Sequence, residues 1–255
     1  MRKVTLRLVP FLFLLYIISY LDRANIGYAA LEMNEALGLT SEMFGIASGI
    51  FFIGYFLFEV PSNILMERYG ARVWIARILI TWGIISVATG FAQNAEQVYI
   101  IRFLLGIAEA GFFPGIILYL THWFRSKELA KTIAMFMTAI PASYILGAPL
   151  STWIMDHIHW INIPGWKWLF ILEGAPAVIL GVVSYFYLTE RPQDAQWLAK
   201  EEKIWLTADL EKERKAMIKT SPNHAKYGHK KALSSPKVWY LALIYFVYIT
   251  GKCVN

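Results

Sequence analysis

Six long apolar runs, separated by polar loops, constrain this chain more than any other feature of its sequence. They lie near residues 8–31, 44–66, 73–92, 98–124, 131–155 and 167–189. About 20 apolar residues of helix cross the roughly 30 Å hydrocarbon core of a bilayer. A backbone in that core must satisfy its own hydrogen bonds, and a helix does so within one segment. The sequence therefore predicts an all-α polytopic membrane protein with six complete spans.

The composition agrees with this prediction. Hydrophobic residues make up 57% and charged residues 16% of the chain, whereas soluble domains carry about 25% charged residues. The basic start and first apolar run also resemble a signal peptide, but the absence of a small-residue cleavage site favours an uncleaved first helix. The single cysteine, Cys253, excludes a disulfide framework within one chain and a cysteine-rich metal site.

The basic residues indicate an orientation. Lys and Arg precede the first run, occupy the loops after the second and fourth runs, and number 11 in the long loop 190–237. The opposite loops carry Lys167 and the acids Glu32, Glu35, Glu42, Glu96 and Asp156. Because cytoplasmic loops are enriched in Lys and Arg, we expect a cytoplasmic N-terminus. Topology also explains the net charge of +6, so nucleic acid is not an expected partner.

We expect three parts along the chain: a six-helix transmembrane bundle over 1–189, a cytoplasmic central loop over 190–237, and an incomplete seventh transmembrane helix over 238–255. Within the loop, 197–220 spaces its apolar residues with a helical period and charges between them. This amphipathic helix either lies on the membrane surface or joins two halves of a larger protein. The last apolar run starts at Trp239 and reaches only about 25 Å before the chain ends.

Four charged residues fall inside predicted spans: Asp22 and Arg23 in the first, and Arg102 and Glu109 in the fourth. Counted from opposite faces at 1.5 Å per residue, all four share the outer half and middle of the bilayer, so they can meet. Their formal charges cancel, which allows a structural salt-bridge network. Alternatively, an acid takes up a proton when an anionic substrate competes for its arginine. We favour the second interpretation, because intramembrane charges usually line a path.

Other residues indicate helix bends and close contacts. Tyr55 lies near the membrane midplane, where its hydroxyl can bond a substrate oxygen, although a tyrosine among phenylalanines is by itself more often a packing residue. Pro61 predicts a bent helix, and Pro114, Pro141 and Pro149 predict breaks. The pairs Gly45/Gly49 and Gly111/Gly115 allow close helix contact. The sequence contains no HExxH, GxSxG, GxGxxG or Walker A pattern, so we expect no enzyme, no cofactor and no metal.

Several stretches together carry a family resemblance. SYLDRANIGYA, VPSNILMERYGARVWIAR, RFLLGIAEAGFFPGIILYLTHWF and WKWLFILEGAPAVILG resemble the major facilitator superfamily, in particular its anion:cation symporter branch. That branch includes proton-coupled carriers for tartrate, phthalate, hydroxyphenylacetate and sugar acids. The resemblance implies a fold of two six-helix halves with the substrate between them, of which this chain is the N-terminal half. It also implies the bacterial inner membrane, a plasma membrane, as location.

The resemblance assigns roles to particular residues. Asp22 and Glu109 match proton-coupling carboxyls, and Arg102 matches an arginine that manages those acids. The expected substrate-binding residues are Arg23, Tyr55, Tyr20 and Asn25, with Arg23 contacting a carboxylate directly. The expected gating loop comprises Glu67, Arg68, Gly70 and Arg72. Asn63 and Glu67 replace a glycine and an aspartate of the superfamily pattern, which questions the close helix approach there.

The resulting hypothesis is a truncated carrier that imports an organic carboxylate with protons. Its partners are a small carboxylate, protons, the lipid bilayer and a missing C-terminal half. An alternative is a non-transporting remnant or a transporter-derived sensor acting through the cytoplasmic loop helix. A seven-helix receptor conflicts with the topology, because the basic N-terminus stays inside.

Overall fold

A computed structural model describes residues 1–220, 235–236, 239–240 and 243–244 of the chain. Most of the predicted seventh span, 238–255, lies outside these residues. The regular elements of the described part are all helical. The chain divides into two compact units, Met1–Ile204 and Trp205–Asn255, and the description that follows concerns the first unit unless stated.

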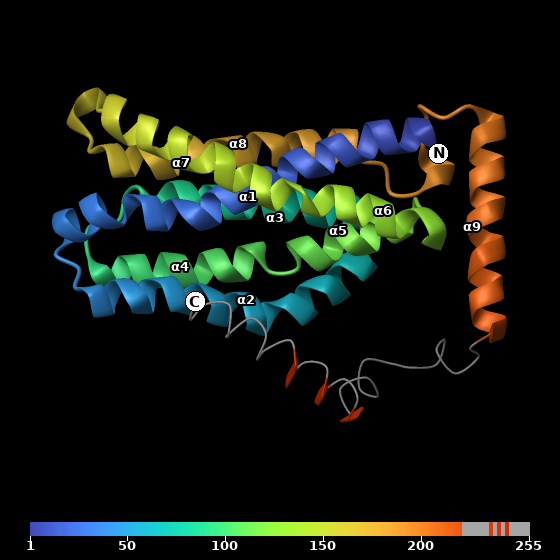
Figure 1. The fold of residues 1–255 in the computed structure, drawn as a ribbon, viewed down its shortest axis with the longest axis horizontal. Coiled ribbons are helices and arrows are strands. Elements are labelled where there is room, and N and C mark those ends of the chain that lie inside the picture. The colour runs from blue at the N-terminus through green and yellow to red at the C-terminus, as the bar shows by residue number, and fades with distance from the viewer. Residues whose placement is uncertain (221–234, 237–238, 241–242, 245–255) are drawn as a thin grey trace. The chain divides into compact units, whose positions relative to one another are not determined.

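The predicted spans are confirmed as six helical stretches that are long and apolar enough to cross a membrane. The α-helices are α1 (Arg2–Leu37), α2 (Ser41–Tyr69), α3 (Ala71–Thr89), α4 (Ala95–Glu109), α5 (Phe112–Thr121), α6 (Ser126–Met137), α7 (Ala139–His157), α8 (Gly165–Tyr187) and α9 (Lys200–Thr220). Two 3₁₀ turns, Trp160–Asn162 and Pro192–Asp194, follow α7 and α8. The fourth span consists of α4 and α5, and the fifth of α6 and α7 (Figure 1).

The broken spans follow from backbone chemistry. Between α4 and α5, Gly111 adopts φ +85°, a conformation that favours glycine. Pro114 is the third residue of α5 and Pro141 the third residue of α7, within the first turn, where a missing N–H removes no helical bond. Both predicted breaks therefore lie just before their prolines. Pro61 and Pro149, in contrast, lie inside continuous helices.

Glycine lets two helix pairs approach closely. A Cβ atom on Gly106 of α4 would lie 2.1 Å from the Phe51 carbonyl oxygen of α2, and one on Gly54 would lie 2.5 Å from the Phe103 carbonyl oxygen. Gly83 of α3 packs in the same way against the backbone of α8. Because lipid gives helices no hydrophobic drive to associate, such close van der Waals packing holds spans together.

The predicted glycine contacts are confirmed for only one pair. Gly111, which directly precedes α5, and Gly115 within it approach the side chains of Ser62 and Met66 on α2. A Cβ atom added to Gly45 or Gly49 would meet no other atom within 4 Å, so the prediction of a close contact there is wrong for this part of the chain.

The segment after α8 returns to the end of the bundle that carries the N-terminus. Trp197 stacks on Trp123 with ring centroids 5.5 Å apart. The Arg7 guanidinium lies 4.5 Å from the Tyr187 ring centroid and 4.9 Å from that of Trp197. The predicted cytoplasmic helix is confirmed as a helix, α9.

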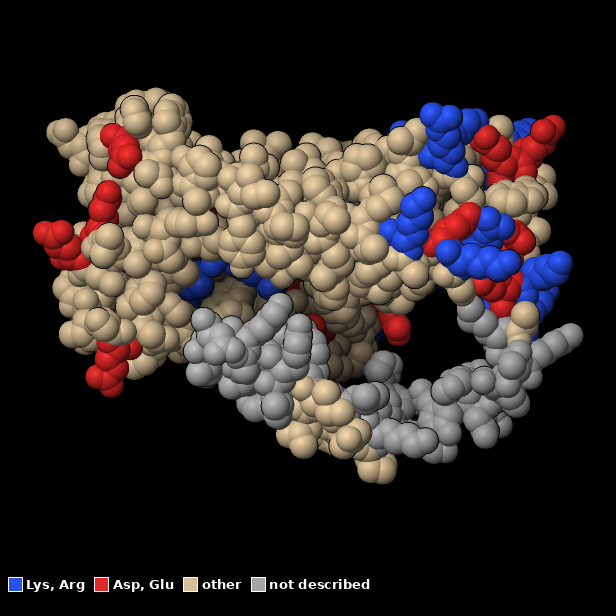
Figure 2. All heavy atoms as spheres, in the orientation of Figure 1, with Lys and Arg blue, Asp and Glu red and all other residues tan. Residues whose placement is uncertain are grey.

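Charges gather at the two ends of the spans. On the face shown, acidic residues lie at the end that holds the α1–α2 and α3–α4 loops, and Lys and Arg lie at the other end together with further acidic residues (Figure 2). Between the two ends the surface is largely uncharged. This band matches the hydrocarbon core expected around a polytopic protein.

The α2–α4 contact gives a stability prediction. Gly106→Ala should lower the free energy of unfolding by about 1–3 kcal/mol, because overpacking forces the two helices apart. Gly45→Ala, whose new methyl group meets open space, should leave stability unchanged or slightly raised. Unfolding by sodium dodecyl sulfate in mixed micelles, followed by circular dichroism, measures both. Equal stability of the two variants would contradict the described contact.

Candidate functional site

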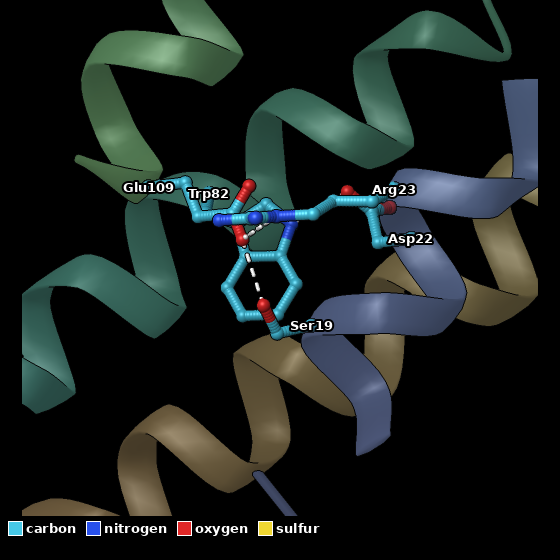
Figure 3. Close-up of polar contacts among 5 residues, drawn as sticks. All are labelled: Ser19, Asp22, Arg23, Trp82 and Glu109. Carbon is cyan, nitrogen blue, oxygen red and sulfur yellow. Dashed lines mark hydrogen bonds and ion pairs between the residues drawn. The ribbon is translucent and has the colours of Figure 1, made fainter. Parts of the chain in front are cut away.

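The structure brings the four intramembrane charges together. Asp22 and Arg23 lie on α1, and Arg102 and Glu109 lie on α4. Figure 3 shows Asp22, Arg23 and Glu109. Asp22, Arg102 and Glu109 expose only 1%, 3% and 0% of their surface, whereas the Arg23 side chain exposes 24%. One cation of the cluster is therefore accessible, and the other three charges are enclosed by protein.

Arg23 and Glu109 form an ion pair. The Arg23 Nε atom donates to Glu109 Oε1 at 2.7 Å, and the Ser19 hydroxyl donates to the same oxygen at 2.7 Å (Figure 3). Ser19 precedes Arg23 by one helical turn, so both side chains leave the same face of α1. Glu109 Oε2 has no hydrogen-bond partner within the described chain.

Aromatic rings surround the Arg23 guanidinium. Its central carbon lies 5.0 Å from the Tyr55 ring centroid, 5.5 Å from that of Tyr20 and 5.8 Å from that of Phe51. A cation within about 6 Å of a ring is attracted by the ring quadrupole. The structure thus places two predicted substrate-binding tyrosines beside the predicted carboxylate-binding arginine, where they hold its orientation.

Asp22 is surrounded by neutral donors. Trp82 Nε1 donates to Asp22 Oδ2 at 2.6 Å, and the Ser86 hydroxyl donates to Oδ1. Asn25 Nδ2 donates to Oδ1 at 3.4 Å. Trp82 and Ser86 lie one turn apart on α3, so a single helix face supplies two of the donors. Asn25, predicted to bind substrate, is fully buried and faces this acid.

Arg102 has a different environment from the one expected. It interacts electrostatically with Asp22 and Glu109, but the direct ion pair to Glu109 is made by Arg23. The Nε and Nη1 atoms of Arg102 have no hydrogen-bond partner among the described residues, and its guanidinium lies 5.1 Å from the Phe51 ring centroid.

At the opposite end from the acidic loops, Glu190 caps α3. Its carboxylate accepts the backbone N–H groups of Ala71 at 2.8 Å and Arg72 at 2.9 Å. A carboxylate at a helix N-terminus satisfies unpaired N–H groups and favours the helix dipole. Gly70, with φ +89°, makes the sharp turn from α2 into α3. Glu190 is not among the residues predicted for this loop, although it directly follows the sixth span.

The remaining residues of the predicted gating loop are spread over the surface. Glu67 and Arg68 are exposed, and the Arg72 guanidinium lies 4.9 Å from the Tyr185 ring centroid. The close helix approach that Asn63 called into question is present, because Gly111 and Gly115 supply it from the start of α5. A Cβ atom added to Gly111 would lie 3.4 Å from the amide nitrogen of Asn63.

Among the described residues, no group of three or more His, Cys, Asp or Glu side chains could hold a metal ion. The polar side chains described above instead form ion pairs and hydrogen bonds with one another.

Comparison with known proteins decides the family. The family described as Major Facilitator Superfamily matches residues 12–251. The chain belongs to this superfamily. The partially occluded, inward-open xylose transporter XylE of Escherichia coli has the same fold, with a TM-score of 0.69, 16% identity, and coverage of 87% of this chain and 60% of that one.

Curated relatives carry transport names. A protein of Agrobacterium vitis named "Putative tartrate transporter" is 52% identical over 96% of this chain and 56% of its own length. NicT of Pseudomonas putida, named a metabolite transport protein, is 44% identical over 96% of this chain and 55% of its own length. RhmT, an inner membrane transport protein of Escherichia coli, is 37% identical over 96% of this chain and 55% of its own length. The chain spans about half the length of these relatives.

The Asp22 environment gives a second stability prediction. Trp82→Phe removes a donor to a buried acid and should lower the free energy of unfolding by about 1–3 kcal/mol. Trp168→Phe, at an exposed indole hydrogen bond, should cost less than about 0.5 kcal/mol. In an Asp22→Leu background the Trp82→Phe cost should shrink. The same detergent unfolding assay tests this, and an unchanged cost would show that Trp82 acts independently of Asp22.

Proposed function

We propose that this chain forms the N-terminal half of a carrier that moves organic carboxylate anions with protons by alternating access. The observation that carries the proposal is the Arg23–Glu109 ion pair, in which a fully buried acid holds the one accessible cation of the cluster. The superfamily membership and the transport names of the relatives support it.

The pair provides a coupling mechanism. While Glu109 is ionised, it occupies Arg23. A proton on Glu109 removes that negative charge and releases the guanidinium, whose planar donors match a carboxylate in a two-point grip. The hydroxyls of Tyr20 and Tyr55, beside the guanidinium, would bond the other oxygens of the substrate. The Glu109 carboxylate and the substrate anion thus compete for one arginine, so the proton and the anion each favour the binding of the other.

Charge balance supports symport. With both acids ionised, Asp22, Arg23, Arg102 and Glu109 carry no net charge. One proton leaves the cluster at +1, and a bound monocarboxylate restores neutrality. Because uncompensated charge in a low-dielectric interior is costly, the neutral states with neither ligand or with both are favoured over states with only one. Arg102, as a permanent charge, sets this balance.

The cluster narrows the substrate class. Relatives at 44% and 41% identity are named a metabolite transport protein and a quinolone resistance transporter, so names vary across the family. Arg23, an accessible permanent cation ringed by aromatic side chains, favours an anion with a planar charged group. A carboxylate fits this requirement and agrees with the tartrate name of two relatives at 52% and 51% identity.

We further propose a location in the bacterial inner membrane with a cytoplasmic N-terminus, which follows from the excess of Lys and Arg on one side. We also propose that a chain with this carrier function is not an enzyme. The alternative of a non-transporting remnant, or of a sensor acting through α9, predicts a chain that folds but does not support transport.

A chimera tests the coupling mechanism. This chain replaces the corresponding half of the Agrobacterium vitis relative, and uptake of a radiolabelled dicarboxylate such as tartrate is measured in vesicles. Glu109→Gln should reduce accumulation driven by a pH gradient at least about tenfold, because no proton can be exchanged there, while counterflow exchange persists.

Two controls accompany that assay. Glu96→Gln alters an exposed acid and should leave uptake unchanged, while Arg23→Gln should abolish both accumulation and exchange, because the anion loses its cation. Full uphill uptake by Glu109→Gln would refute the role given to Glu109, and the remnant alternative would gain support if the parent chimera folded without transporting.

Orientation has its own test. With Cys253 changed to serine, single cysteines are placed by Glu96→Cys and by Lys3→Cys, and intact cells are treated with a membrane-impermeant maleimide. Glu96→Cys should be labelled from outside and Lys3→Cys only after lysis. The reverse pattern would overturn the proposed topology.

A further inference from the structure

A cavity of about 660 Å³ lies at the end of the bundle that carries the N-terminus. It is lined by the start of α1, the turn between α2 and α3, and the end of α8 with the segment that follows. All of these parts belong to the first compact unit. Small-molecule sites have volumes of roughly 300–1,000 Å³, so this cavity is large enough for a polar ligand.

Two arginines of the lining have no carboxylate partner. Arg7 and Arg72 take part in none of the ion pairs found among the described residues. The Arg7 Nε atom is buried and has no hydrogen-bond partner within that part of the chain. Lys3, one turn before Arg7 on α1, is in contrast paired with Glu202 at 2.5 Å. Two unpaired cations beside one cavity favour an anionic ligand.

Aromatic rings hold both guanidinium groups. That of Arg7 lies 4.5 Å from the Tyr187 ring centroid and 4.9 Å from that of Trp197, and that of Arg72 lies 4.9 Å from the Tyr185 ring centroid. The Tyr187 hydroxyl also donates to the backbone oxygen of Arg7 at 3.1 Å. A ring attracts a guanidinium through its face, which leaves the N–H groups at the edge available to a ligand.

The acids of the lining are compensated in other ways. Both oxygens of Glu190 accept backbone N–H groups at the start of α3, and Asp194 is exposed to solvent. The charges of these two acids are therefore stabilised by a helix N-terminus and by water. The charges of Arg7 and Arg72 have neither form of compensation from an acid.

An exposed apolar stripe on α8 ends at the cavity. Phe186, which lines the cavity, is 79% exposed, and Val182 and Ile179, one and two turns earlier, are 48% and 63% exposed. Their spacing places all three on one face of the helix. Val73 of α3, also in the lining, is exposed as well. A contiguous apolar surface beside a charged cavity suits a ligand with a polar head and an apolar chain.

We propose that this cavity binds the head group of an anionic phospholipid, with its phosphodiester on Arg7 and Arg72 and an acyl chain along the α8 stripe. A guanidinium donates two parallel hydrogen bonds to a phosphate. Basic pockets between membrane helices bind anionic head groups, and bilayer phosphates lie at the level where the spans end. The bound lipid joins α1, α3 and α8 at one end of the bundle. The proposal is independent of the transport mechanism above.

Native mass spectrometry measures this binding without transport. The 255-residue chain is purified in an uncharged detergent and titrated with phosphatidylglycerol, or with phosphatidylcholine of the same chains. Phosphatidylglycerol should bind about tenfold more tightly. Combined Arg7→Gln and Arg72→Gln should weaken its binding about tenfold or more, because a hydrogen bond to a charged group contributes on that order. The binding of phosphatidylcholine should stay unchanged.

Matched variants separate the site from general effects. Arg191→Gln removes an exposed arginine outside the lining and should leave the phosphatidylglycerol affinity unchanged. Phe186→Ala should weaken that affinity severalfold, whereas Phe91→Ala, at an exposed ring beyond the other end of α3, should not. Circular dichroism confirms helicity in each variant. If the double variant loses its helicity, Arg72→Gln alone provides the same comparison.

Three results would overturn the proposal. One is equal affinity for the two lipids, and another is phosphatidylglycerol binding that persists unchanged when both arginines are replaced. The third is displacement of the lipid by soluble glycerol 3-phosphate at a similar concentration, which would assign the cavity to a free phosphate ester. A chimera that fails to transport would leave these binding results unaffected, so the two proposals fail separately.

Discussion

The need to neutralise charge inside a helical bundle governs this structure. Arg23 lies in the middle of a span, and the ion pair with Glu109 at 2.7 Å makes that position tolerable. The pair fixes how α1 faces α4, because both residues must meet. Ser19 then joins from the same face of α1. The aromatic rings around the guanidinium complete an environment in which only one cation stays accessible.

Much of the fold follows from the sequence because hydropathy is a local property. Six spans, with helix ends that lie within six residues of the predicted bounds, and the convergence of four charges at one depth all derive from counting residues along helices. The fourth and fifth spans break just before prolines for a similar reason, since a missing N–H removes no helical bond in the first turn of a helix. These features depend on one segment at a time.

Pairing between side chains depends on how helices rotate against one another, which no single segment encodes. Depth alone allowed either arginine to hold Glu109, and the structure gives that bond to Arg23. The neutral donors Trp82 and Ser86 cannot be recognised from charge or hydropathy along the sequence, although both donate hydrogen bonds to Asp22. The expectation that Asn63 would prevent a close helix approach was wrong for a related reason. A close contact requires a small residue on only one of its two helices, and Gly115 provides it.

The division of the fourth span into α4 and α5 has a mechanical consequence. Glu109 is the last residue of α4, and the chain turns at Gly111 before α5 begins. One membrane crossing is therefore made of two short rods with separate axes. Both rods pack on α2 and α3, and the second also contacts α6. The acid at the joint sits where a small rotation of either rod moves its carboxyl relative to α1.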